Sequence, residues 1–587
     1  MKSLLLVDSR EDNWQGACRL INFLLATGAE VRWATEPFTA IAPDGAERNM
    51  PAGSCLITDT TLHAELAMPA AEARYGVDVQ QLAGVDGFVG HALRRLRIAL
   101  YGGGGAPFNH ARIFTELGFA VEFLSPQAIC AGELDDYDLL VAPGGGGLAM
   151  AGQLQPLGSE GCTRITNWVR RGGMYIGSCA GAFNAAVTPE PFSLTCPVQR
   201  DLQMVNAGIW NRGDSQWMGL QSPGIGVIEC RNQQPDHPVM FGMPEHFLMT
   251  HYNGPLFDIE TRELEDASAA TALTSVRGRH ADFTPAERFL SFSQPAADPL
   301  IDKAAKYGVP NTISGFVGLG RTVLFGSHPE FGFNLTMDDW GIPARMLANA
   351  AFWQSSQLRA SRSPTVRREP GAPHAYPAGS GLARVAAACQ EIGDLVEDLQ
   401  SVAADEVAWL NEDHAMSVFG LVGCEIWRRG LGDFADIAAR MQETLDCAET
   451  VLARAQKQID GPALADEGIR HLRELTLAVE DALHHRWPDE WQQDFGYEGL
   501  LQMLERAQTM LRRALDNAGR EFEQSDNAYQ HFDSSPYQLV VGSYLAANGV
   551  VLNAWQLLRM HVLRLEEAIF VREAGASVSD ALLGGEK

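Results

Sequence analysis

The sequence "GSCAGAF", Gly177 to Phe183, places a cysteine between two glycines directly after the apolar stretch "GGMYI". A buried structural cysteine does not need a glycine on each side, and a metal site would need a second ligand nearby. The G-x-C-x-G pattern is typical of a sharp turn from a strand into a helix. The backbone of such a turn is strained, and its neighbours must be small. The sequence therefore predicts an exposed thiol, Cys179, above the edge of a sheet.

The position of this thiol favours chemical reactivity. A helix N-terminus carries partial positive charge, which favours the thiolate form of a cysteine. The amide N–H of Ala180 faces the same space and is a candidate donor to an oxyanion. The turn taken alone leaves a second reading open, in which Cys179 is a buried cysteine in a glycine-rich turn.

Strands and helices alternate on both sides of the turn. Apolar stretches that read as strands end in glycine-rich or polar loops at "RIALYGGGG", "YDLLVAPGGGG", "HFLMTHYNGPLF" and "RTVLFGSHPEFGF". This alternation predicts an α/β fold with a mostly parallel, Rossmann-like or flavodoxin-like sheet that is covered on both faces. Ligands of such sheets bind beyond the carboxyl ends of the strands. We therefore expect Gly103 and Gly104 to lie near the same pocket as Cys179.

The stretch "GSHPEF" supplies a candidate base. His328 and Glu330 lie two residues apart after an apolar strand, so both side chains can lie on one side of an extended backbone. The histidine can take the thiol proton, and the carboxylate can fix the tautomer and stabilise the imidazolium. His-x-Glu alone is common on protein surfaces. Together with the cysteine turn in one α/β segment, it predicts a triad of Cys179, His328 and Glu330.

With these residues the chain resembles the class I glutamine amidotransferase superfamily. The motif "CAGAF", together with "YGGGG", "APGGGG" and "HYNGPLF", is most similar to the amidotransferase-like domain at the N-terminus of biotin–protein ligases. The resemblance covers about residues 97 to 357. The resemblance implies that Cys179 is the nucleophile, His328 the general base and acid, and Glu330 the orienting carboxylate. It also implies a second oxyanion donor in the backbone of Gly144, Gly145, Gly146 and Gly147.

The chain departs from the family at specific positions. Amidotransferases that use glutamine usually carry Gln four residues after the cysteine, where this chain has Phe183, so the resemblance does not extend to glutamine as donor. Peptidase-like relatives often have His where this chain has Ala180. No P-loop and no biotin ligase half occurs in the sequence. We place Phe183 in the pocket with His251, Tyr252 and Asn253 of "THYNGP", and His251 is a reserve base.

Composition and hydrophobic periodicity divide the chain into four segments. Residues 1–95 read as a small α/β domain that begins with a βαβ unit, or as an extension of the main sheet. Residues 96–357 form the amidotransferase-like domain. A segment rich in Pro, Gly, Ser and Arg, 358–383, reads as a linker. Helical periodicity over 384–587 predicts a C-terminal all-α bundle of five or six helices.

The net charge and the cysteine content restrict the classes of partner and of cellular compartment that we expect. The formal net charge of −28 disfavours nucleic acid as a partner. The ten cysteines include no CxxC pair, and "MKSLLLVDSRED" has too short an apolar run for a signal peptide, so we expect a cytoplasmic protein with reduced thiols. The uncharged run 534–558 is long enough to span a bilayer. Its Asn, Gln, Gly and Ser residues favour a buried bundle helix, so we expect no membrane partner.

The sequence therefore predicts a cysteine-nucleophile amidase or amidotransferase-like hydrolase that acts on a small-molecule amide or acyl substrate without cofactor or metal. Glu480 with His484, and Asp481 with His485, could bind a metal from one helix face, but such i,i+4 pairs are more often surface contacts. Two alternatives stay open. The domain could be an inactive binding or regulatory protein, or the bundle could carry the main function by binding a partner enzyme or forming a homo-oligomer.

Overall fold

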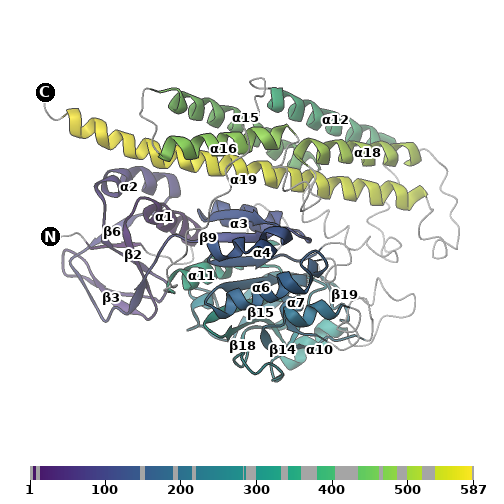
Figure 1. The fold of residues 1–587 in the computed structure, drawn as a ribbon, viewed down its shortest axis with the longest axis horizontal. Coiled ribbons are helices and arrows are strands. Elements are labelled where there is room, and N and C mark those ends of the chain that lie inside the picture. The colour runs from purple at the N-terminus through teal and green to yellow at the C-terminus, as the bar shows by residue number, and fades with distance from the viewer. Residues whose placement is uncertain are drawn as a thin grey trace.

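The structure is a computed structural model. It describes residues 4–7, 13–145, 153–188, 196–213, 220–281, 283–285, 299–331, 341–357, 380–402, 434–461, 467–484, 499–518 and 536–584. Figure 1 shows three parts: a small sheet formed near the N-terminus, a larger α/β part, and a layer of long helices that lies over both.

The larger α/β part is built on a ten-stranded sheet. Its strands are β9 (Arg97–Tyr101), β10 (Ala120–Leu124), β11 (Leu139–Ala142), β12 (Met174–Ser178), β15 (Gly224–Asn232), β16 (His246–Tyr252), β18 (Thr271–Arg279), β19 (Thr284–Pro285), β20 (Pro310–Val317) and β21 (Gly320–Phe325). The order across the sheet is β10-β9-β11-β12-β21-β20-β18-β15-β16, and β19 pairs with β15.

The predicted α/β class is confirmed, but the parallel pairing is limited to one half of the sheet. Strands β10, β9, β11, β12 and β21 pair in parallel, whereas β20, β18, β15, β16 and β19 pair antiparallel to their neighbours. A tight turn joins β20 to β21, and a hairpin can pair its strands only in antiparallel. The loops that carry Gly103, Gly144, Cys179 and His328 follow strands of the parallel half, whereas Tyr252 and Asn253 lie at the end of β16 in the antiparallel half.

Helices cover both faces of the parallel half. Alternate strand residues point to opposite faces, so Ile98 and Leu100 join one apolar cluster while Ala99 and Tyr101 join the other. The first cluster includes residues of α3 (Phe108–Glu116) and α11 (Ala344–Ser355). The second includes residues of α4 (Pro126–Ala131), α6 (Gly158–Arg170) and α7 (Ala180–Ala185).

Shorter elements complete the α/β part. They are the helix α10 (Leu300–Tyr307), the 3-10 helices η2 (Glu133–Asp136), η3 (Pro197–Asp201), η4 (Pro238–Met240) and η5 (Pro329–Phe331), and the strands β13 (Ala186–Val187), β14 (Val205–Ile209) and β17 (Phe257–Asp258). The three strands form a small sheet in the order β13-β14-β17.

The N-terminal part has sheets of its own and does not extend the main sheet. One sheet has the order β6-β1-β5-β2-β8 and the other β4-β3-β7. The predicted βαβ unit is present as β1, α1 and β2, but β5 lies between the two strands and is antiparallel to both. The elements are β1 (Leu4–Val7), α1 (Trp14–Ala26), β2 (Glu30–Ala34), β3 (Phe38–Ile41), β4 (Glu47–Met50), β5 (Cys55–Asp59), α2 (Leu62–Tyr75), β6 (Val79–Leu82), β7 (Gly84–Asp86) and β8 (Gly90–Ala92).

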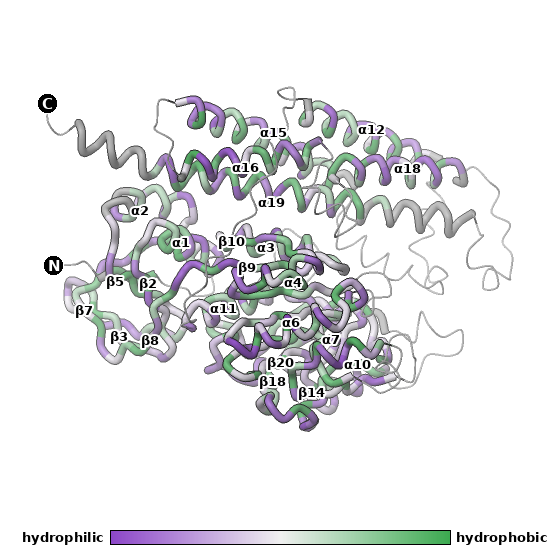
Figure 2. Tube along the Cα trace, viewed as in Figure 1, coloured by the Kyte–Doolittle hydropathy of each residue, from purple (hydrophilic) through white to green (hydrophobic). Residues whose placement is uncertain are grey.

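The predicted C-terminal helical bundle is present. Its described helices are α12 (Ser380–Val402), α15 (Phe434–Ile459), α16 (Glu467–Leu483), α18 (Leu500–Ala518) and α19 (Pro536–Gly584). Apolar and polar residues alternate along them, as expected of helices with one buried face (Figure 2). Helix α12 begins at Ser380, before the predicted bundle start at 384. The rest of the predicted linker lies outside the described residues.

Helix α19 joins the three parts. It lies across α2 and α3 (Figure 1), and one apolar cluster runs through all of them. The Phe570 ring lies 5.4 Å from that of Phe23, and the Arg74 guanidinium lies 4.6 Å from the Phe570 ring. Arg112 of α3 lies 4.5 Å over the ring of Trp555. Among the described residues no helix combines the length and apolarity needed to cross a bilayer.

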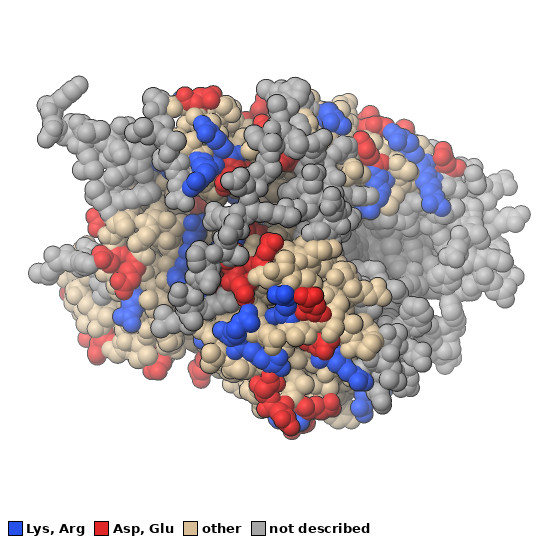
Figure 3. Space-filling model, in the orientation of Figure 1, with Lys and Arg blue, Asp and Glu red and all other residues tan. Residues whose placement is uncertain are grey.

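The surface in Figure 3 carries both signs of charge. Lys and Arg side chains lie interspersed with Asp and Glu over the α/β part of this face. Proteins that bind nucleic acid usually collect their basic side chains in one patch or stripe. The described residues of this face show no such collection.

Candidate active site

Cys179 occupies a strained turn between β12 and α7. Its backbone angles are φ 49° and ψ −107°, in a region that residues other than glycine rarely adopt. Its amide donates to the Phe325 carbonyl at 2.7 Å, which ties the turn to the end of β21. A Cβ at Gly177 would lie 2.6 Å from the Gly181 carbonyl oxygen, and one at Gly181 would clash with the Ala142 carbonyl. The glycines that flank the thiol are therefore required by close backbone packing.

The loop after β21 brings His328 and Glu330 to the same edge of the sheet. The His328 amide donates to the Thr250 carbonyl at 2.8 Å, and its ring stacks on Phe331 with a centroid distance of 4.5 Å. His328 Nδ1 donates to Glu330 Oε1 at 2.7 Å. Both side chains are buried, so the carboxylate fixes the imidazole with its Nε2 turned away from Glu330.

Gly144, in the loop after β11, lies against both His328 and Cys179. A Cβ on Gly144 would lie 2.6 Å from His328 Cε1 and 2.8 Å from Cys179 Cβ. His328 Nε2 is buried and has no hydrogen-bond partner among the described residues. Three segments that are distant in the sequence thus bring together Cys179, His328 and Glu330, with Nε2 as the ring nitrogen that remains available for a proton.

The charges around His328 favour its protonated form. Burial alone would lower the pKa of His328, but the charges of Glu330 and Cys179, and the hydrogen bond to Glu330, raise it to about 10. Burial would raise the pKa of Glu330, but His110 and His328 hold it below its usual value. The resulting pair of a carboxylate and an imidazolium places positive charge beside the Cys179 sulfur.

The structure adds His110 to the site, a residue that the sequence analysis missed. His110 lies on α3 and is 0% exposed. Its Nε2 lies 3.0 Å from Ser178 Oγ and 3.5 Å from Glu330 Oε2. Burial and the nearby charge of His328 lower the pKa of His110, against the effect of Glu330. The one sequence signal was a histidine on the helix that directly follows the "YGGGG" loop.

Two of the predicted pocket residues border the thiol. Ala180 is the first residue of α7, so its amide N–H has no partner within the helix and remains available as a donor. The carbonyl oxygen of Tyr252 lies 3.5 Å from Cys179 Sγ. The Tyr252 ring lies edge-on to the ring of His328. Asn253 follows with a φ of 51°, and its Oδ1 accepts from the hydroxyl of Ser222. This second non-glycine residue with a positive φ directly follows β16.

Two other predicted pocket residues are turned into the core. Phe183 is 0% exposed and belongs to the apolar cluster beneath α6 and α7, so it does not line the pocket as predicted. His251 is also 0% exposed, and its Nδ1 lies 3.0 Å from Ser327 Oγ. Burial, with the nearby charge of His328, lowers the pKa of His251 to about 3. The reserve base is thus a neutral core residue.

The predicted glycine loops pack on one another. The loop of Gly103 and Gly104 follows β9, and the Ala106 amide next to it donates to the Gly144 carbonyl at 2.8 Å. Gly145 has a φ of 75°, which suits glycine. Gly146 and Gly147 lie outside the described residues. The loop after β9 therefore supports the loop that separates Cys179 from His328.

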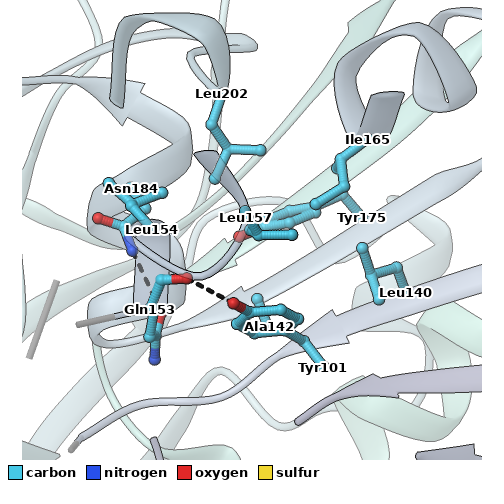
Figure 4. Close-up of a pocket in the computed structure, with 10 residues that line it drawn as sticks. All are labelled: Tyr101, Leu140, Ala142, Gln153, Leu154, Leu157, Ile165, Tyr175, Asn184 and Leu202. Carbon is cyan, nitrogen blue, oxygen red and sulfur yellow. Dashed lines mark hydrogen bonds between the residues drawn. The ribbon is translucent and has the colours of Figure 1, made fainter. Parts of the chain in front are cut away.

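A small cavity lies beneath this loop, on the side of the sheet that α6 covers. Figure 4 shows its mostly apolar lining, with Tyr101 Oη donating to the Gln153 carbonyl at 2.5 Å. Gln153 Nε2 donates to the Pro143 carbonyl at 2.8 Å, and Asn184 Nδ2 donates to Gln153 Oε1 at 3.1 Å. Cys179, His328 and Glu330 do not line the cavity, so we assign it to core packing.

The i,i+4 pairs of the helices, which the sequence analysis favoured as surface contacts over metal ligands, are only partly described. Glu480 and Asp481 lie on α16, and His485 lies outside the described residues. Within the described segments no group of three or more His, Cys, Asp or Glu side chains is placed to hold a metal ion.

The contacts of Gly144 give a direct test of this geometry. In Gly144→Ala the new Cβ forces His328 or Cys179 to move, and misplacement by about 1 Å can cost about 10²-fold in rate. We expect Cys179 to react with iodoacetamide about 10²-fold more slowly in this variant. Gly393→Ala is the control, because a Cβ at that position of α12 has no atom within 4 Å. Unchanged reactivity in Gly144→Ala would show that the two side chains do not flank this glycine.

A family comparison supports the resemblance seen in the sequence. The family described as biotin-protein ligase, N terminal, matches residues 110–198. This match confirms the predicted similarity to the amidotransferase-like N-terminal domain of biotin–protein ligases, over a shorter segment than the predicted 97–357. The matched segment includes His110, Gly144 and Cys179, and it ends before His328. A comparison with curated proteins gives no match.

Three of the solved structures that match this chain are distantly similar to it. A protein described as ThuA-like from Bacteroides uniformis has 13% identity and a TM-score of 0.26, over 44% of this chain and 90% of that one. A ThuA-like protein from Parabacteroides merdae has 14% identity and a TM-score of 0.28, over 46% and 94%. A protein from Salmonella typhimurium, named as cytoplasmic, has 12% identity and a TM-score of 0.27, over 44% and 98%. TM-scores this low decide neither the fold nor the function.

Proposed function

We propose that this chain is a thiol-dependent acyl-transfer enzyme that acts on an amide or another small acyl compound. The observation that carries the proposal is the arrangement of Cys179, His328 and Glu330. A partly exposed thiol in a strained turn lies across Gly144 from a buried imidazole, and that imidazole donates to a buried carboxylate at 2.7 Å. A nucleophile, a base and an orienting group in this order are the parts of a covalent acyl-transfer mechanism.

The first half of the reaction forms a thioester. The Cys179 thiolate attacks the acyl carbon, and the carbonyl electron pair moves to oxygen. The N–H of Ala180 donates to this oxyanion. His328 then gives its Nε2 proton to the leaving nitrogen or oxygen, the bond from the acyl carbon to that atom breaks, and the leaving group departs neutral. Glu330 stabilises the imidazolium before this step and holds the ring in place during it.

The second half releases the acyl group. Neutral His328 takes a proton at Nε2 from water or from a bound amine, and the oxygen or nitrogen of that molecule attacks the thioester carbon. The bond from carbon to sulfur breaks, and Cys179 leaves as thiolate beside a restored imidazolium. Water gives the carboxylic acid, and an amine gives a new amide. This route uses side chains of this chain alone and balances without an oxidant or reductant.

The reactivity of the thiol tests the proposal. We expect brief treatment with dilute iodoacetamide near neutral pH to label Cys179 at least about tenfold faster than any other described cysteine, because a positive neighbour favours the reactive thiolate. Burial raises the pKa of the other described cysteines, Cys18, Cys55, Cys130, Cys162, Cys196, Cys230, Cys389 and Cys447. Intact-protein mass spectrometry with peptide mapping gives the rate at each site.

Two variants complete this test. Cys179→Ser should abolish the fast phase of labelling, whereas Cys130→Ser should leave it unchanged, since Cys130 is also partly exposed but lies on α4. A p-nitrophenyl ester should then acylate Cys179 with a burst of p-nitrophenol, and the acyl adduct should map to this residue. Labelling of Cys179 at the rate of Cys130 would exclude an activated nucleophile and favour the alternative of an inactive binding protein.

A further inference from the structure

His110 and Glu330 meet in the core beneath the reactive thiol. Glu330 presents one oxygen to each of two histidines: Oε1 lies 2.7 Å from His328 Nδ1, and Oε2 lies 3.5 Å from His110 Nε2. His110 Nε2 also lies 3.0 Å from Ser178 Oγ, the residue before the nucleophile. His110 therefore bridges the carboxylate of the site and the strand that ends in Cys179.

We propose that His110 is a positioning residue: its Nε2 pairs with Ser178 Oγ and faces Glu330 Oε2 at 3.5 Å, an oxygen with no hydrogen bond among the described residues, so that Glu330 Oε1 stays aligned with His328. This inference rests on the proposed function and deepens it. An ionised carboxylate only accepts hydrogen bonds, so the His110 proton belongs on Nε2, the nitrogen that faces it. A lone pair at that position would instead face an anionic oxygen inside the protein, where uncompensated polar groups are costly.

The helix that carries His110 is held firmly from its other side. Residues two apart on a helix lie on nearly opposite faces. Arg112 accordingly points away from the site, is 1% exposed and lies 4.5 Å over the Trp555 ring of α19. Helix α3 is thus held between α19 and the site, which limits how far His110 can move from Glu330.

Loss of His110 is expected to change the pKa of His328. The titratable groups around His110 are Glu330 and His328, and those around His328 are Cys179, Glu330 and the neutral His251. Without the polar N–H of His110 facing Oε2, Glu330 holds its charge less well in the core and stabilises the His328 imidazolium less. The pKa of His328 then falls, so less imidazolium remains beside Cys179 as the pH rises.

The test measures the pH at which His328 loses its proton, by NMR of the full chain labelled at histidine, between pH 5 and pH 11. We expect His110→Leu to lower this pH by about one unit, since one pKa unit corresponds to a tenfold change in the equilibrium between the charged and neutral forms. We expect His110→Gln, whose side-chain amide nitrogen can occupy the place of Nε2, to stay within about half a unit of the wild type. His237→Gln is the matched control, since His237 Nε2 lies 3.2 Å from Ser314 Oγ, away from Glu330.

The outcomes separate this inference from the proposed function. Slow labelling of Cys179 in the wild type would remove the activated thiol itself. Fast labelling in the wild type together with an unchanged pKa of His328 in His110→Leu would overturn the role of His110 alone. Equal shifts in His110→Gln and His110→Leu would also overturn it, because an N–H group at the place of Nε2 would then make no difference. Thermal unfolding of each variant shows whether a change comes from loss of the folded structure.

Discussion

Replacement of His328 by alanine is expected to slow alkylation of Cys179 by iodoacetamide at pH 6 on the order of 10²-fold, because an ordinary thiol with a pKa of about 8.5 is almost entirely protonated there. In the wild type, the imidazolium of His328 lies next to the sulfur and is itself held by Glu330 at 2.7 Å. Removing the imidazole removes the positive charge that favours the thiolate and also the group that accepts the thiol proton.

The pH dependence gives the direction of this effect. The pKa of His328 is raised to about 10, so its imidazolium is present below that pH and is lost above it. We therefore expect nearly constant reactivity of the wild type from pH 6 to pH 9. The rate in His328→Ala should instead rise about tenfold per pH unit up to the ordinary thiol pKa of about 8.5, and the two rates should converge above it. The measurement is a rate at each pH, from mass spectrometry of the labelled peptide.

Two further histidine variants serve as controls for the assignment of His328 as the activating group. His237→Ala should leave the rate unchanged, because His237 lies against Trp353 and Ser314 and not in the site. His251→Ala tests the reserve base of the sequence analysis. A large loss in His251→Ala, combined with none in His328→Ala, would contradict the assignment of His328 and make His251 the group that activates the thiol.

The local parts of this fold could be predicted, and the pairing of distant strands could not. Strand, loop and helix followed from apolar runs, glycines and helical period between 97 and 178, because each of these patterns is fixed by residues close in sequence. The insertion of β5 between β1 and β2 brings together segments that share no local pattern. The antiparallel half of the main sheet was missed because its strands are joined by hairpins and loops that the helix–strand alternation does not describe.

The same distinction holds in the site. Cys179 was predicted from its glycines, since only a crowded turn needs small residues on both sides, and His328 with Glu330 was predicted from their spacing. His110 was missed because "FNHARIF" looks like any amphipathic helix, and its role arises only when α3 packs against η5. Phe183 was placed in the pocket from its position after the cysteine. In the structure its apolar ring lies in the core, where burial is worth more than contact with a substrate.

The largest expected effect on stability is at Trp555, where the helical bundle meets the α/β part. The Trp555 side chain is 6% exposed, its Nε1 donates to Thr444 Oγ1 at 3.1 Å, and the Arg112 guanidinium lies 4.5 Å from its ring. Trp555→Ala removes the ring from the core and also removes the aromatic face against which a buried guanidinium rests. We expect a loss of about 3 to 5 kcal/mol in the free energy of unfolding, from the lost burial and the cavity left behind.

Denaturant unfolding followed by circular dichroism measures this loss, with Phe316→Ala as the control. The Phe316 side chain is 47% exposed and meets Trp353 edge-on, so its removal should cost less than about 1 kcal/mol. Because α3 carries Arg112 on one face and His110 on the other, a loosened contact with α19 should also slow Cys179 alkylation. A shift in Trp555→Ala no larger than that of Phe316→Ala would mean that the bundle does not depend on this contact, and α3 would then have to be held by the α/β core alone.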